Sequence, residues 1–187
     1  MNNSSITSPQ SSSVVLTTLN LIAEALVKSP INTTSKAITY SGSNMAFGLK
    51  TIPQNHTGPV TTIINDSEQL VSVNFETKNN HEDAFGQNIS SENFRLPEEL
   101  FREAPEHVFT YVLKDGSMFV SNHSRHGNKT LQTKRLAGHV ISISLLNKSV
   151  SGLSNPIEYS TWVLDIEEGM NETCGFWKIE GIIWGNV

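Results

Sequence analysis

The sequence predicts a mainly β protein, an antiparallel β-sandwich preceded by one helix. Three observations support this prediction. Short runs rich in β-branched and aromatic residues alternate with Gly, Pro, Asn and Asp, which is typical of strands and turns. No helical pattern separates these runs, so βαβ units are not indicated. Asp115-Gly116, between two of the runs, predicts a hairpin turn because this pair tolerates a positive φ.

The predicted helix covers residues 14–30 and ends at Pro30. Its apolar residues recur at helical spacing on one face: Val15, Leu19, Ile22, Leu26 and Val27. We interpret this face as part of the core rather than as a stripe that binds a partner. Residues 1–13 are rich in Ser and Asn and predict a flexible linker.

We expect the β-sandwich to occupy residues 31–187. The predicted strands are, in chain order, KAITY, MAFGLKTI, PVTTII, LVSVNF, HVFTYVLK, SMFVSN, GHVISISLLN and PIEYSTWVLDI. Residues 76–92 are polar and predict a surface loop, whereas LPEELF predicts one helical turn with Pro97 at its first position. Apolar and polar side chains alternate over residues 140–145, so we expect one buried and one wet face there.

The composition excludes several classes of function. The chain has 187 residues, the size of one domain, and carries a net charge of −5 at pH 7 without any block of Lys or Arg. A surface that binds nucleic acid or an anionic membrane is therefore not expected. No apolar run approaches the roughly 20 residues that are needed to span a bilayer.

Asn-x-Ser/Thr sequons indicate an extracellular glycoprotein. The sequence contains ten of them, whereas its content of Asn, Ser and Thr would give roughly four by chance. Ser/Thr-rich loops in any compartment are the alternative explanation. Beyond the linker, the candidate acceptors are Asn32, Asn55, Asn65, Asn88, Asn122, Asn128, Asn147 and Asn171.

Two further features indicate a piece of a longer protein. The start, MNNSSITSPQSSS, lacks the basic and apolar regions of a signal peptide. Cys174 is the only cysteine of the chain, and an odd cysteine in a secreted protein implies a partner elsewhere.

No motif in the sequence predicts an enzyme or a cofactor. His123 and His126 are the only close pair of histidines, but neither Cys nor a carboxylate stands at ligand spacing, so we expect a polar loop and no metal site. Nucleophile elbows, phosphate loops, CxxC and HExxH are absent. The acidic stretch DIEEGMNE lacks the alternation of a calcium loop and is interpreted as a charged turn.

The C-terminal residues carry a resemblance to a known family. In NETCGFWKIEGIIW, bulky aromatic residues surround the cysteine, and VISISLLNKSVSGLSNPIEYSTW precedes this stretch. The pattern resembles the membrane-proximal half of the GAIN domain of adhesion G-protein-coupled receptors. The residues that match the start of its GPS motif are Cys174, Phe176, Trp177 and Trp184.

Upstream segments resemble the same family in the same order. FRLPEELF, VFTYVLKDGSMFV and the Leu153-x-x-Pro156 spacing match its elements, so the resemblance covers about residues 37–184. Polycystin-type receptors share this module. The resemblance implies a β-sandwich of GAIN subdomain B type, with the helix at 14–30 as the end of a helical subdomain and a partial GPS motif within residues 31–187.

The resemblance also implies a function and two departures from it. In the family, the sandwich holds a tethered agonist strand for transmembrane signalling. The cysteine matching Cys174 pairs there with one that follows the position of Trp184, and this chain has no such cysteine. The family cleaves itself before a Ser or Thr that follows His-Leu, but no histidine here precedes Leu. We therefore expect no self-cleavage and no catalytic residue.

We expect this protein to lie on the extracellular side of the plasma membrane, as part of a receptor. We do not expect these residues themselves to contact the membrane. The expected partners are the downstream seven-helix region and agonist strand of the parent receptor and an extracellular ligand, without nucleic acid. The alternative is a free-standing secreted β-sandwich that binds a protein or a glycan. Zinc held by His123 and His126 would instead favour an enzyme.

Overall fold

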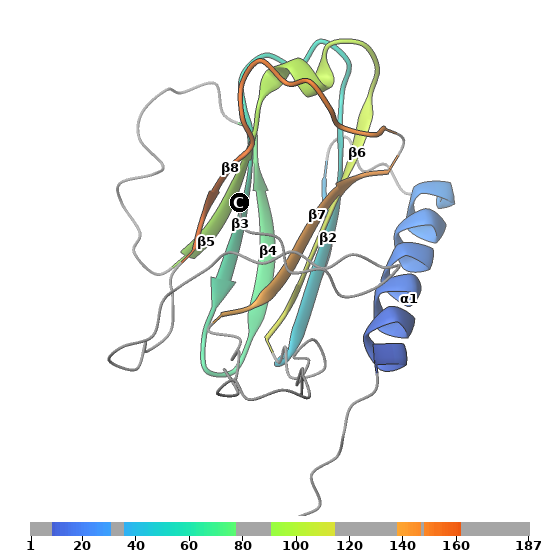
Figure 1. Ribbon diagram of the computed structural model, residues 1–187, viewed down its shortest axis with the longest axis vertical. Helices are drawn as coiled ribbons and strands as arrows, with labels where there is room; N and C mark the ends of the chain where they lie inside the picture. Colours follow the sequence, from blue (N-terminus) through green and yellow to red (C-terminus); the bar gives the residue numbers. More distant parts are fainter. Residues whose placement is uncertain (1–8, 31–35, 78–90, 115–137, 147, 162–187) are drawn as a thin grey trace, which may run out of the picture.

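The described residues of the computed structural model of the protein form one α-helix, a short 3₁₀ helix and two four-stranded antiparallel sheets (Figure 1). The structure describes residues 9–30, 36–77, 91–114, 138–146 and 148–161. Helix α1 (Pro9–Lys28) packs on one sheet, and that sheet packs on the other, so the elements form three layers. The predicted mainly β sandwich with an N-terminal helix is confirmed.

Each sheet contains strands from both halves of the chain. Sheet A has the order β1-β2-β6-β7, formed by β1 (Ile38–Ser41), β2 (Met45–Ile52), β6 (Glu106–Leu113) and β7 (Val140–Leu145). Sheet B has the order β4-β3-β5-β8, formed by β4 (Val71–Glu76), β3 (Val60–Asp66), β5 (Ser91–Leu96) and β8 (Glu158–Ser160). The two sheets approach each other along β1 and β2 of sheet A and β4 of sheet B.

Helix α1 covers the outer face of sheet A. Leu19 and Ala23 are buried against Leu49 of β2 and Phe109 of β6. The remaining residues of the predicted apolar face are partly buried against the same cluster: Val15, Ile22, Leu26 and Val27. The face is therefore core, as expected. The helix begins at Pro9, inside the segment expected to be a linker, because proline is compatible with a first helical turn.

Sheet A is the middle layer, so its central strand β6 is buried on both faces. Phe109 and Tyr111 point toward the helix, whereas Val108 and Val112 join the core between the sheets. Burial on both faces explains why HVFTYVL reads as a continuous apolar run rather than as an alternating pattern.

Strand β7 differs from its prediction. All six of its residues are partly exposed, where one buried and one wet face were expected. Val140 contacts the cluster under the helix, while Ile141 and Ile143 contact the core between the sheets. The prediction of a wet face is wrong because both faces of sheet A are covered, and full burial is absent because β7 is an edge strand.

Strand β5 was not predicted at all, and its first residues lie in the segment expected to be a loop. The predicted helical turn is a 3₁₀ helix, η1 (Glu98–Phe101), with Pro97 in the capping position rather than at the first helical position. The predicted strand SMFVSN and the end of PIEYSTWVLDI lie outside the described residues.

Candidate functional site

Strands β7 and β8 are the edge strands on one side of the sandwich. Since β1 and β2 face β4 at the other side, the last strands of the two sheets lie on the same side. In the described part of the chain, β7 pairs only with β6 and β8 pairs only with β5. One edge of each strand is therefore not covered by a neighbouring strand among the described elements.

Apolar side chains line this side between the two sheets. Ile141 of β7 and Phe94 of β5 pack against the same buried cluster, and Ile143 packs against the next one. Phe94 stacks on Tyr159 of β8 with ring centroids 4.4 Å apart and planes 19° apart. Tyr159 is nevertheless 43% exposed, and the other three are only partly buried. We call the side lined by Phe94, Ile141, Ile143 and Tyr159 the open side.

Polar contacts hold β7 against β6 on the face toward the helix. The Tyr111 hydroxyl forms a hydrogen bond with Ser142, while burial raises the pKa of Tyr111 and the Ser142 contact opposes this. Ser144 Oγ lies 3.5 Å from the carbonyl oxygen of Phe109. The serines that were expected to be wet therefore contact neighbouring residues of sheet A, and Ile141 and Ile143 are turned toward the open side.

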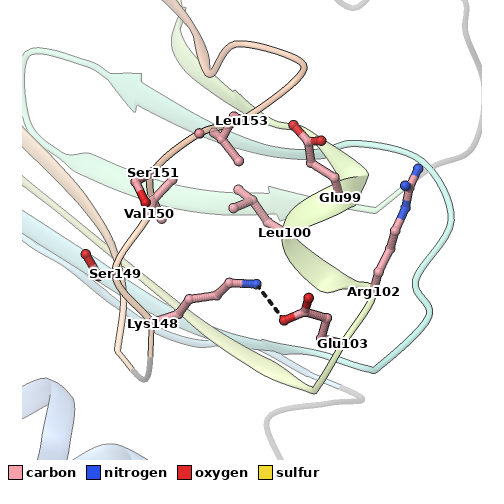
Figure 2. Close-up of a pocket in the computed structure, with 10 residues that line it drawn as sticks. Glu99, Leu100, Arg102, Glu103, Lys148, Ser149, Val150, Ser151 and Leu153 are labelled. Carbon is pink, nitrogen blue, oxygen red and sulfur yellow. Dashed lines mark ion pairs between the residues drawn. The ribbon is translucent and has the colours of Figure 1, made fainter.

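A separate cleft of about 350 Å³ lies between η1 and the segment 148–153 (Figure 2). Figure 2 shows Lys148 pointing at Glu103, with 3.7 Å between its Nζ and the carboxylate. Glu99 accepts a hydrogen bond of 2.9 Å from the backbone N–H of Asn155. Glu103 thus contacts this segment, and Glu99 contacts the chain just beyond it, which accounts structurally for both carboxylates.

Charge pairing continues beside the cleft. Arg102 lies 2.7 Å from Glu98, and this hydrogen bond, followed by one from the Gly58 N–H, holds the pKa of Glu98 below its ordinary value. Within the residues that the structure describes, no group of three His, Cys, Asp or Glu is placed to hold a metal ion.

Two of the predicted glycosylation acceptors lie in the described part of the chain. Asn55 is exposed in the turn between β2 and β3, with a φ of 58°. Asn65 is exposed on β3, so this sequon lies on a strand rather than on a loop. The other candidate residues lie outside the described residues: Asn32, Asn88, Asn122, Asn128, Asn147, Asn171, His123, His126, Cys174, Phe176, Trp177 and Trp184.

The sequence did not reveal the open side. Phe94 and Leu96 stand two residues apart, as expected for one face of a strand, but Glu92 interrupts the apolar pattern. Glu92 is buried all the same, at 1% exposure. An alternation search that admitted one buried carboxylate would have found β5.

Comparison with known proteins finds a likeness in structure. No protein-family model matches the sequence, and no curated protein matches it. The full extracellular region of the adhesion receptor Gpr126/Adgrg6 from zebrafish is similar in structure, with a TM-score of 0.53 and 15% sequence identity. The match covers 77% of this chain but only 18% of that one. The likeness shows a shared fold with a small part of that region.

The described residues contain no helix that could span a membrane. None of the helices there has the length and apolar character that crossing a bilayer requires.

Proposed function

We propose that this chain is a GAIN-type domain from the extracellular region of an adhesion-type receptor, in which the sandwich holds a β-strand supplied by the receptor's own downstream chain. The proposal rests above all on the open side, where an edge strand and half-covered apolar side chains meet. The structural likeness to the extracellular region of an adhesion receptor and the ten sequons support it.

An added strand would gain two kinds of interaction at the open side. Among the described strands none pairs with the outer edge of β7, so its backbone N–H and C=O groups can form a further sheet ladder, the usual basis of strand addition. Alternate side chains of the new strand would lie over Ile141 and Ile143 and beside the Phe94–Tyr159 stack. Backbone pairing would give affinity, and the apolar positions would give register.

The expected energies suit a strand that is held but can be released. Burying one large apolar side chain contributes roughly 1.5–3 kcal/mol, and ordering one residue's backbone costs roughly 1–2 kcal/mol. A strand of about six residues that buries alternate side chains is therefore close to balance. Covalent attachment to the same chain gives the strand an effective concentration in the millimolar range, and this shifts the balance toward the bound strand.

The first experiment extends the reading frame by sequencing the transcript beyond the codon for Val187. A cysteine-rich stretch, His-Leu-Ser/Thr and seven apolar segments would support the receptor. A stop codon at that point would overturn the proposal and favour the free-standing secreted sandwich that binds a protein or a glycan.

The second experiment compares this chain with a version extended through the downstream strand. Hydrogen exchange should be slower at the amides of β7 in the extended version, because that edge is then paired. Ile143→Asp should abolish the difference, since it places a charge on the open side. Val150→Asp, at a residue that is 38% exposed and lies elsewhere, is the matched control. Equal protection of β7 in both versions would contradict strand addition.

A further inference from the structure

Five polar side chains from both sheets meet at one end of the sandwich. Asp66 ends β3, Glu92 lies on β5, and Lys114 follows β6. His139 immediately precedes β7, and Thr161 immediately follows β8. Residues from the two edge strands that bound the open side are thus joined to the centre of sheet B.

The imidazole of His139 lies between two carboxylates. Its Nδ1 is 2.9 Å from Glu92 Oε2, and its Nε2 is 3.2 Å from Asp66 Oδ2. The His139 side chain is 4% exposed, and that of Glu92 is 1% exposed. Both ring nitrogens therefore face carboxylate oxygens in a place that water scarcely reaches.

The remaining oxygen of each carboxylate accepts from a different donor. Lys114 Nζ lies 2.7 Å from Asp66 Oδ1 and 2.8 Å from the carbonyl oxygen of Ser67. The Thr161 hydroxyl donates to Glu92 Oε1. Each carboxylate thus has a polar partner at both of its oxygens.

This arrangement favours the doubly protonated form of the histidine. A neutral imidazole carries a single N–H, so the lone pair of its other nitrogen would face a carboxylate at close range. An unsatisfied buried contact of that kind is unfavourable. A doubly protonated ring donates to both carboxylates, and the two cations Lys114 and His139 then balance the two anions Asp66 and Glu92.

The electrostatics agree with the geometry. The hydrogen bond to Glu92 raises the pKa of His139, burial opposes this, and the charges of Glu92 and Asp66 add to the increase. Among the described residues, the charged groups that contact the ring or its carboxylates come from β3, β5 and the end of β6: Asp66, Glu92 and Lys114.

We propose that these residues form a proton-operated clamp, in which protonated His139 fastens the start of β7 to sheet B and loss of the proton loosens the end of the open side. Deprotonation leaves two poorly hydrated carboxylates with Lys114 as the one cation among the described groups that contact them. The clamp stands independently of the receptor function. If that function also holds, retention of the added strand becomes dependent on pH.

The direction of the pH dependence follows from the raised pKa. The folded state binds the proton more tightly than the unfolded state, in which histidine titrates near its ordinary value of 6.5. The stabilisation is therefore complete below that value and is lost as the pH rises through the folded-state pKa. The clamp is closed in acidic conditions and opens in alkaline ones.

The direct test is the ring ¹⁵N resonances of His139 in the intact chain, followed from about pH 5 to about pH 9. Both nitrogens should show the imidazolium signature well above the pH at which an exposed histidine titrates. Glu92→Gln should lower the titration midpoint of His139. A neutral tautomer at about pH 6, or a midpoint that Glu92→Gln leaves unchanged, would overturn the proposal.

The second readout is hydrogen exchange over the same range, corrected for the intrinsic rate. Protection in β7 and β8 should fall as His139 deprotonates, whereas β2, at the other side of sheet A, should keep its protection. In His139→Gln the protection of β7 should be low at every pH. His107→Gln removes a ring whose Nδ1 lies 2.8 Å from the Thr51 hydroxyl instead of a carboxylate, and it is the matched control. Protection of β7 that is independent of pH in the unsubstituted protein would refute a clamp.

Discussion

Gly48 of β2 lies directly against the ring of Phe75 of β4, and a β-carbon at this glycine would stand 2.7 Å from Phe75 Cε2. It would also stand 3.1 Å from Val73 Cγ1. Real β-carbons essentially never approach a heavy atom as closely as the first of these distances. The missing side chain therefore sets how closely the two sheets approach along β2 and β4.

Gly48→Ala should destabilise the fold by about 1–3 kcal/mol, since an added methyl group overpacks a filled core. The measurement is the urea midpoint, with an unchanged slope. Combining Phe75→Leu with Gly48→Ala should recover part of the lost stability, because the aromatic ring that the new methyl group would clash with has been removed. An unchanged midpoint in Gly48→Ala would show that the sheets can separate at no cost.

Leu19→Ala should cost about 2–5 kcal/mol, because Leu19 is 2% exposed in the cluster between α1 and sheet A. Leu21→Ala changes the same residue type on the same helix at a position that is 59% exposed, so its effect should stay within about 0.5 kcal/mol. Thermal unfolding of the two variants gives the comparison. Equal effects would mean that α1 is not part of the cooperative core.

Tyr159→Ala should loosen β8 without unfolding the protein, with a cost of about 0.5–1.5 kcal/mol for the lost stack on Phe94. Glu158→Gln breaks the ion pair with Arg95, whose atoms are 3.3 Å apart at a half-exposed position, and should cost less than about 1 kcal/mol. The loss of hydrogen-exchange protection at β8 shows which of the two substitutions loosens the strand more. A larger loss of protection in Glu158→Gln than in Tyr159→Ala would show that the ion pair holds β8 more strongly than the stack does.

Asn55 should carry a glycan in material secreted by eukaryotic cells, since its side chain is exposed in a turn. Asn55→Gly removes the acceptor and keeps the positive φ of 58°, which glycine adopts without strain. The mass should fall by one glycan relative to the unsubstituted chain, and enzymatic deglycosylation should make the two equal apart from the substitution. Identical glycan masses before that treatment would show that the sequon is unused.

Strands with a strong local pattern could be predicted from the sequence. MAFGLKTI and LVSVNF form β2 and β4 nearly residue by residue, because apolar positions recur along each of them. Strand β5 could not be predicted in the same way. SENFRL contains Glu92, Asn93 and Arg95, and it becomes a strand through its pairing with β3 and β8.

The open side and the His139 cluster depend on contacts that are remote in the chain. His139 and Glu92 are 47 positions apart, and the sequence around His139 gives no sign that a carboxylate lies near it. Phe94 and Tyr159 meet only because β8 joins sheet B next to β5. Local sequence patterns predict individual strands, but they do not predict the order in which the strands join a sheet. The GPS residues Cys174, Phe176, Trp177 and Trp184 stay predictions.

From the strand orders we expect a particular sequence of assembly during translation. Sheet A starts from the neighbours β1 and β2, sheet B starts from the neighbours β3 and β4, and each then grows toward the open side by strands that come later in the chain. Pairing of neighbours closes short loops and is fast, whereas β8 reaches β5 only after a long intervening segment. Since the N-terminal part leaves the ribosome first, a nascent chain that is stalled before β8 should already protect both hairpins. The open side is thus formed by the strands of each sheet that are synthesised last among the described elements.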